Sequence, residues 1–188
     1  METAIKSING VNVEQLLGTI EAVKSDPGIA LFKFKSNTRW IYGGHCRTEI
    51  REFYGAKQDD TSRVKPFVIE GDEPPVLLGE NHGPNAVEAV LHALASCLSV
   101  GFVYNASAMG IGIKALEFAV EGELDLHAFL GMFDKSRPGF RNISVTVKVD
   151  ADASKEKLEE LLNYVKATSP VLDIVMNPVP VTVQMNVK

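Results

Sequence analysis

Cysteine is scarce in this chain of 188 residues, which contains only Cys46 and Cys97. Two cysteines cannot build the disulfide framework of a small secreted protein, and they suit a reducing compartment. Residues 1–10 show neither the basic start nor the apolar stretch of a secretory signal. The sequence therefore predicts a cytoplasmic protein with free thiols.

Positive charge and metal-binding motifs are also sparse. The 19 Lys and Arg residues are outnumbered by 24 Asp and Glu residues, and no Lys/Arg cluster with interleaved aromatic residues occurs. A nucleic-acid partner is therefore not expected. The four histidines are scattered, neither CxxC nor HExxH is present, and Gly110-Ile111-Gly112 precedes a strand pattern rather than a helix. We expect no metal and no cofactor.

Charge is absent altogether from residues 89–113, a run long enough to cross a bilayer. The run contains His92, Ser96 and Asn105, however, and no Lys/Arg cluster flanks it. A fully buried central helix explains it better, because such a helix is apolar all round without lipid. The sequence predicts no membrane partner.

The patterns that are present predict an α+β fold, with antiparallel sheets around the long central helix and a second, amphipathic helix. Apolar residues recur with helical period over 11–24 and 154–167. Strand patterns cover 32–34, 40–42, 47–54, 67–70, 116–126, 143–149 and 179–187. Residues 55–65 are polar and 128–140 irregular, so both are expected to be loops.

The central helix has clear boundaries. Asn85 is the expected N-cap, and Glu88 lies three residues later, where a capping box places the carboxylate that accepts the N–H of the cap. Gly110 supplies a left-handed residue after the helix, which we expect to end near Met109.

Cys97 lies in the middle of this helix and is the candidate centre of any chemistry. Its helical neighbours are Ala93, Leu94, Val100 and Gly101, none of which is charged. A thiol in such surroundings stays protonated and inert unless another segment delivers a cation. A buried core thiol is therefore the alternative interpretation.

Gly83-Pro84-Asn85-Ala86-Val87-Glu88, followed by Ala95-Ser96-Cys97, resembles the helix of the OsmC/Ohr family, the osmotically inducible and organic hydroperoxide resistance proteins. The resemblance covers roughly residues 30–188. It includes Trp40 with Gly43-Gly44, Leu124-Asp125-Leu126, Arg137-Pro138-Gly139-Phe140 and Ser169-Pro170-Val171.

The helical pattern over 11–24, which Asp26-Pro27-Gly28 ends, predicts a helical extension over 1–28. The resemblance implies a single OsmC-like domain over 29–188 that forms an intertwined homodimer. It also implies a cofactor-free thiol peroxidase, in which Cys97 attacks an organic hydroperoxide during oxidative stress. In that family an arginine activates the cysteine, and a second cysteine resolves the resulting sulfenic acid as a disulfide.

The sequence departs from the family pattern at three positions. Ser169 stands where many members have the second cysteine. Glu88 lies one residue later than the glutamate of the hydroperoxide-resistance branch, where this chain has Val87. Arg47 is the nearest candidate for the activating arginine, with Arg39 and Arg51 as alternatives.

Two functions stay open on this evidence. The first is a peroxidase whose catalytic residues are Cys97, Arg47 and Glu88, with either an external thiol or Cys46 resolving the sulfenic acid. Strand alternation places Cys46 and Arg47 on opposite faces, which favours the external thiol. The second is a non-catalytic protein that binds a small apolar ligand on the same scaffold.

Overall fold

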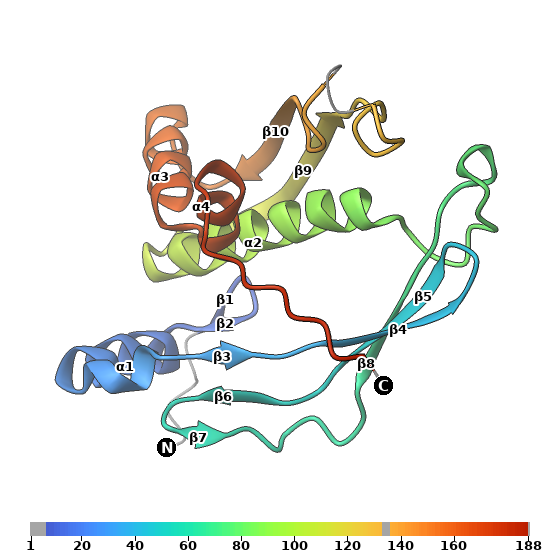
Figure 1. Ribbon diagram of the computed structural model, residues 1–188. Coiled ribbons are helices and arrows are strands. Elements are labelled where there is room, and N and C mark those ends of the chain that lie inside the picture. The colour runs from blue at the N-terminus through green and yellow to red at the C-terminus, as the bar shows by residue number, and fades with distance from the viewer. Residues whose placement is uncertain (1–6, 133–135, 188) are drawn as a thin grey trace. The chain divides into compact units, whose positions relative to one another are not determined.

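The computed structural model describes residues 7–132 and 136–187, and its chain divides into two compact units (Figure 1). The first unit holds residue 7 and residues 12–90, and the second holds residues 8–11 and 91–187. The expectation that 29–188 form a single domain stays a prediction.

The first unit contains one helix and most of the short strands. Helix α1 (Val13–Ser25) begins at Asn12, whose side-chain oxygen accepts the N–H of Gln15 at 3.0 Å. A 3-10 turn, η1 (Pro27–Ala30), follows α1. The strands of this unit are β3 (Lys33–Phe34), β4 (Asn37–Tyr42), β5 (His45–Ile50), β6 (Phe53–Gly55), β7 (Gln58–Asp59) and β8 (Phe67–Gly71).

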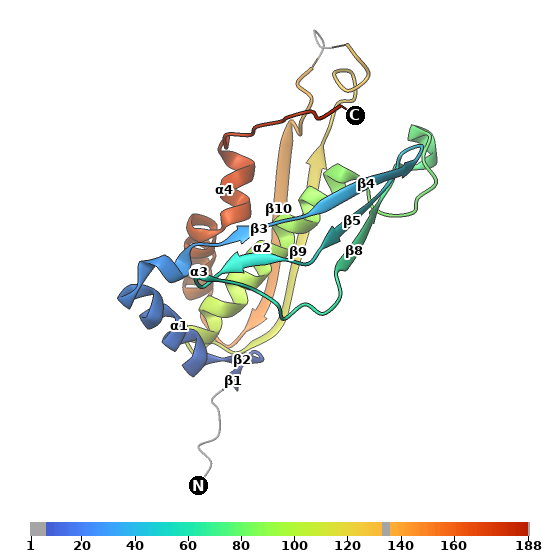
Figure 2. The same ribbon diagram turned by 60° about the horizontal axis from the view of Figure 1, so that its bottom comes forward.

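Two antiparallel three-stranded sheets form from these strands. One has the order β4-β5-β8 (Figure 2), and the other has the order β3-β6-β7 (Figure 1). Positive φ at Gly43 (+53°) allows the tight turn between β4 and β5. Strand β7 lies inside the segment expected to be a loop, where it pairs with β6. A second 3-10 turn, η2 (Pro75–Leu77), follows β8.

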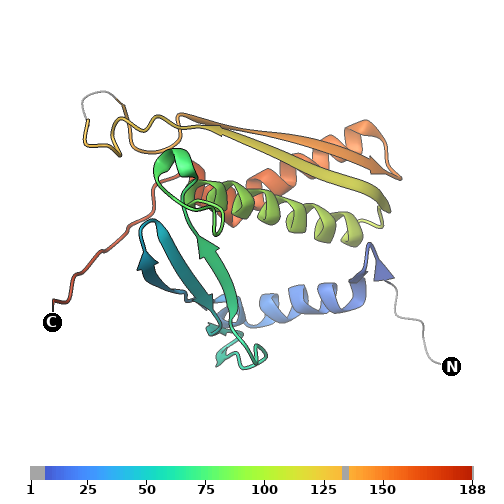
Figure 3. The same cartoon turned by 90° about the vertical axis from the view of Figure 1, so that its right-hand side faces the viewer.

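The second unit is built on a long antiparallel hairpin, β9 (Ile113–Glu123) with β10 (Asn142–Ala151). Both strands alternate half-buried and exposed residues, as their sequence predicts. Helix α2 (Ala86–Ala108) runs along this hairpin (Figure 3), and α3 (Lys155–Thr168) and α4 (Pro170–Met176) follow β10. A short hairpin, β1 (Ser7–Ile8) and β2 (Val11–Asn12), precedes α1.

Both ends of helix α2 have the capping features that the sequence predicts. Asn85 and Glu88 form the reciprocal capping box, with both hydrogen bonds at 2.9 Å. Gly110 has φ +74°, as expected of the residue that terminates the helix. By length and composition alone, α2 is also able to cross a membrane.

The core of the second unit lies between α2, α3 and the hairpin. One face of α2 contributes its buried residues at four-residue spacing, namely Leu94, Leu98, Phe102 and Ala106. Leu161 and Val165 of α3 join them. On the opposite face Val100 is 49% and Tyr104 48% exposed. Helix α2 is thus the central core helix that the sequence predicts, with its buried residues along one face.

Phe102 is the largest fully buried side chain, and its ring meets Phe118 of β9 edge to face. Phe102→Ala is expected to lower the free energy of unfolding of this unit by about 3–5 kcal/mol, because truncation leaves a cavity. Urea denaturation followed by circular dichroism measures the change. Phe129→Ala is the matched control, since that ring is 76% exposed, and an equal loss in both variants would contradict the prediction.

Residues 178–187 do not form the closing strand that their alternation predicts. They follow α4 without regular secondary structure. Their apolar side chains are largely exposed, at 76% or more for Val181, Val183, Met185 and Val187. Within the described part of the chain no strand pairs with them, so their backbone groups lack the ladder that would define a strand.

Candidate functional site

Cys97 opens onto an apolar cavity that lies within the second unit. The cavity has a volume of about 550 Å³ and is bounded by α2, the last turn of α3 and the start of α4. None of its lining side chains is a Lys, Arg, Asp or Glu: they are His92, Ala93, Ser96, Cys97, Val100, Gly101, Val165, Thr168, Ser169, Pro170 and Val171. Cys97 is half-buried and forms no disulfide. A small apolar molecule that enters this cavity therefore reaches the sulfur.

Gly101 brings the two helical walls together. A Cβ at this position would lie 3.2 Å from Cγ1 of Val165, tighter than an ordinary contact. The missing side chain lets α3 approach α2 one turn after Cys97. Ala93, Val100 and Gly101, the uncharged helical neighbours of Cys97, all line the cavity.

Ser169 places a hydroxyl beside the sulfur. Its Oγ lies 3.3 Å from Sγ of Cys97, and the residue is only 6% exposed. Pro170 cannot continue α3, and Ser169 caps the next helix by accepting the N–H of Leu172 at 3.2 Å. The position that matches the family's second cysteine is thus adjacent to Cys97, but it carries a hydroxyl.

The three candidate arginines belong to the first unit, and each contacts an oxygen there. Arg47 pairs with Glu70 at 2.7 Å, and Arg39, opposite it on β4, pairs with Glu49 at 2.8 Å. Arg51 donates to the carbonyl of Arg63 at 3.2 Å. The assignment of any of them to Cys97 stays a prediction.

Cys46 and Arg47 lie on opposite faces of β5, as alternation requires. His45 and Arg47 both contact Glu70, whereas Cys46 is directly opposite Gly71 in the sheet. A Cβ on that glycine would lie 3.0 Å from the sulfur of Cys46. The prediction that these two residues face apart is confirmed.

Glu88 uses its carboxylate at the helix start, where Oε2 accepts the N–H of Asn85. The sequence favoured this capping role. Its further assignment to the catalytic site stays a prediction.

The carboxylate of Asp72, which is 4% exposed, organises the segment that leads to α2. Its oxygens accept the N–H groups of Glu73 (2.8 Å), Glu80 (3.1 Å) and His82 (3.2 Å), as well as Nδ1 of the His82 ring at 2.8 Å. The His82 side chain first, and then these N–H groups, hold the pKa of Asp72 far below its ordinary value.

This low pKa predicts an acid-sensitive segment. Because the folded pKa lies below the unfolded one, Asp72 stabilises the fold above about pH 4, and this contribution is lost as the pH falls further. Hydrogen-exchange protection at residues 73–82 is expected to fall in that range. Asp72→Asn is expected to lose protection already at pH 7, unlike the control Asp59→Asn on the exposed β7. Equal protection in both variants would argue against the role of Asp72.

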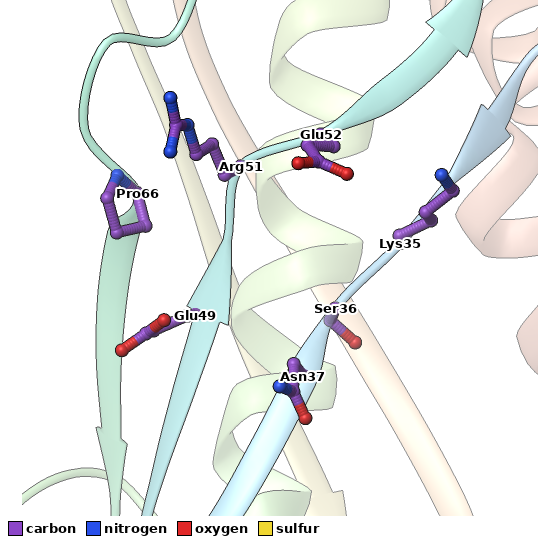
Figure 4. Close-up of a pocket in the computed structure, with 7 residues that line it drawn as sticks. All are labelled: Lys35, Ser36, Asn37, Glu49, Arg51, Glu52 and Pro66. Atoms are coloured by element: carbon purple, nitrogen blue, oxygen red, sulfur yellow. The ribbon is translucent and has the colours of Figure 1, made fainter.

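A second hollow, of about 440 Å³, lies in the first unit (Figure 4). Its wall mixes both charges and offers no cysteine, being formed by Lys35, Ser36, Asn37, Glu49, Arg51, Glu52 and Pro66. Among residues 7–132 and 136–187, no group of three metal-binding side chains is placed to hold an ion.

The sequence missed most of the wall that faces Cys97. Val165 is recognisable as an apolar residue of α3, and Val171 follows the Ser-Pro pair, but their approach to α2 depends on the packing of three helices. Gly101 is one signal that the sequence offers, because a glycine within a helix allows close approach of another element.

Comparison with known proteins gives a consistent result. The family model described as OsmC-like protein matches residues 79–184. No curated protein matches the sequence.

Among solved structures, an OsmC-like protein of Mycoplasma pneumoniae is similar, with 18% identity, a TM-score of 0.57, and coverage of 78% of this chain and 89% of that one. An OsmC-like protein of Vibrio cholerae has 12% identity, a TM-score of 0.55, and coverage of 75% and 92%. An organic hydroperoxide resistance protein, OsmC, of Legionella pneumophila has 15% identity, a TM-score of 0.53, and coverage of 78% and 90%. At these identities the structures show a shared fold.

Proposed function

Because this chain belongs to the OsmC-like protein family, whose model matches more than half of it, we propose that it is a thiol peroxidase centred on Cys97. Family membership supports a redox role in stress. The specific proposal is that Cys97 reduces organic hydroperoxides in the cytoplasm, with an external thiol as reductant. The observation that carries it is a half-buried free thiol at the wall of an apolar cavity.

The proposed reaction needs no metal or cofactor. The Cys97 thiolate attacks the outer oxygen of a hydroperoxide, the O–O bond breaks, and the alcohol leaves after taking a proton. A low-molecular-weight thiol then attacks the sulfenic acid, which forms a mixed disulfide and releases water. A second thiol molecule releases Cys97 and leaves as the oxidised disulfide.

The apolar wall favours hydroperoxides with an alkyl or aryl group over hydrogen peroxide. Val100, Val165 and Val171 provide surface that such a group can remove from water. Cumene hydroperoxide is therefore the appropriate probe, with hydrogen peroxide for comparison.

The decisive experiment uses the two single-cysteine variants. In Cys46→Ser, one equivalent of cumene hydroperoxide should convert Cys97 to a sulfenic acid that dimedone traps, as measured by mass spectrometry of the intact protein. Cys97→Ser is the matched control and should stay unmodified over the same time. A Cys97 that reacts only in denaturant would refute the peroxidase.

The same experiment addresses the alternative function. Ser169 in place of a second cysteine is compatible with a protein that has lost turnover and retains a small apolar ligand in the same cavity. That function requires ligand binding without oxidation of Cys97, so an unreactive thiol together with saturable binding of an apolar fluorophore would favour it.

Arg47 is the residue that we propose to activate Cys97. Arg47→Ala is expected to slow sulfenic acid formation at pH 6 about tenfold or more, because a cation near the sulfur stabilises the thiolate. Arg39→Ala is the matched control, since Arg39 lies opposite Arg47 in the same sheet and has its own glutamate partner. If Arg39→Ala slows the reaction and Arg47→Ala does not, the assignment moves to Arg39.

We also propose that the protein is a homodimer. The support is the apolar surface that one chain leaves exposed, on α2 at Val100 and Tyr104 and along residues 179–187. In a symmetric dimer each copy presents the same surface to the other, so a second copy of this chain can cover the exposed apolar residues.

A further inference from the structure

The hydroxyl oxygen of Ser169 lies within hydrogen-bond distance of two groups. The residue is 6% exposed, and its Oγ accepts the N–H of Leu172 at 3.2 Å. That contact occupies a lone pair and leaves the single hydroxyl proton free. The other neighbour of the oxygen is Sγ of Cys97, at 3.3 Å. When Cys97 is a neutral thiol, either group can donate to the other. When Cys97 is ionised, only the hydroxyl has a proton to give, so the hydroxyl then donates to the sulfur.

We propose that Ser169 is a positioning residue that donates a hydrogen bond to the Cys97 sulfur and so stabilises the thiolate. The proposal rests on the proposed reactivity of Cys97 and concerns the same cavity. No Lys or Arg lines that cavity, and its one titratable side chain besides Cys97 is His92. The Ser169 hydroxyl lies within hydrogen-bond distance of the sulfur. Hydrogen bonds to a charged group are stronger than those to a neutral one, and the contact thus favours the ionised thiol.

On this assignment Ser169 stabilises the Cys97 thiolate, at a position where a cysteine would form a disulfide with Cys97. A hydroxyl cannot be oxidised to a disulfide, so the contact outlasts the oxidation of Cys97. The sulfenic acid then persists until an external thiol enters the cavity and reacts with it. Ser169 in this way raises the reactivity of Cys97 while leaving the resolving step to an external partner.

The test measures the pH midpoint of Cys97 alkylation by iodoacetamide in a Cys46→Ser background, without peroxide. Ser169→Ala is expected to raise this midpoint by about one pH unit, which corresponds to about tenfold less thiolate at a given pH. Ser169→Thr retains the hydroxyl and should keep the midpoint of the parent protein. Ser169→Gly removes the hydroxyl but preserves most of the capping preference, so it should behave like Ser169→Ala even if the alanine variant folds poorly.

Ser154→Ala is the matched control for stability. Ser154 is the N-cap of α3 and accepts the N–H of Lys157 at 3.3 Å, but it lies outside the cavity. It loses the same kind of cap and should leave the midpoint unchanged. An unchanged midpoint in Ser169→Ala and Ser169→Gly, or an equal rise in Ser154→Ala, would overturn the assignment. Because no peroxide is used, failure of Cys97 to reduce cumene hydroperoxide would refute the peroxidase and leave this result standing.

Discussion

Ser169→Cys is expected to convert an unpaired thiol into a disulfide-forming pair. Treatment of this variant with one equivalent of cumene hydroperoxide should join Cys97 to the new cysteine in nearly every molecule, whereas the parent protein forms no such bond. The expectation follows from the 3.3 Å between Sγ of Cys97 and Oγ of Ser169. Two sulfurs bond at about 2.05 Å, and small rotations of both side chains close this difference.

Each disulfide formed in this variant consumes one molecule of hydroperoxide. The hydroperoxide converts Cys97 to its sulfenic acid, and the thiol at position 169 displaces water as the S–S bond forms. Peptide mapping should find the crosslink, and the intact mass should fall by two hydrogens. Cys46 should remain free throughout.

Thr168→Cys is the matched control for this prediction. Thr168 also lines the cavity, but its hydroxyl donates to the carbonyl of Tyr164 at 2.9 Å, which directs the side chain back along α3. A cysteine there should stay unpaired. A crosslink of equal yield in both variants would mean that the segment moves freely past Cys97, and the geometry described for Ser169 would be wrong.

The local features of the fold were predictable because adjacent residues determine them. The capping box of Asn85 and Glu88 and the glycine at 110 set the ends of α2 without help from distant contacts. The alternation of β9 from Leu116 onward, and of β10 throughout, likewise reflects a hairpin with one buried face.

The structure of a segment that needs a second strand to pair with could not be predicted from its own sequence. Residues 179–187 alternate as a strand, but a strand exists only when another strand accepts its hydrogen bonds. Helix α4 is the element that the sequence patterns above do not include. Ser169 followed by Pro170 nevertheless has the form of an N-cap with proline at the first helical position, which indicates a helix start.

Only those parts of the candidate site that depend on neighbouring residues or on the family resemblance were predictable. The sequence identifies Cys97 and its uncharged neighbours on α2, because these depend only on helical spacing. The resemblance identifies Ser169 as the position facing Cys97, and the 3.3 Å contact confirms it. The rest of the cavity wall depends on how α3 and α4 pack, which no local pattern encodes.

The proposed homodimer predicts a large change in molecular mass when its interface is disrupted. Residues 179–187 place apolar side chains at every odd position and polar ones between them, apart from Pro180. In an extended segment this alternation gives one apolar face, and Val183 on that face is 89% exposed. Ordering such a segment as a strand requires a sheet edge, and in a symmetric pair each copy can offer one to the other.

Two substitutions in adjacent residues test this arrangement. Val183→Lys places a charge on the apolar face of the segment, and Gln184→Lys places the same charge on the polar face. Light scattering at micromolar concentration should give twice the chain mass for the parent protein and for Gln184→Lys. Val183→Lys should shift to the mass of one chain, because burying an unpaired ammonium in the interface is costly. A parent protein that is monomeric at this concentration would refute the dimer. A dimer in all three proteins would show instead that the C-terminal segment lies outside the interface.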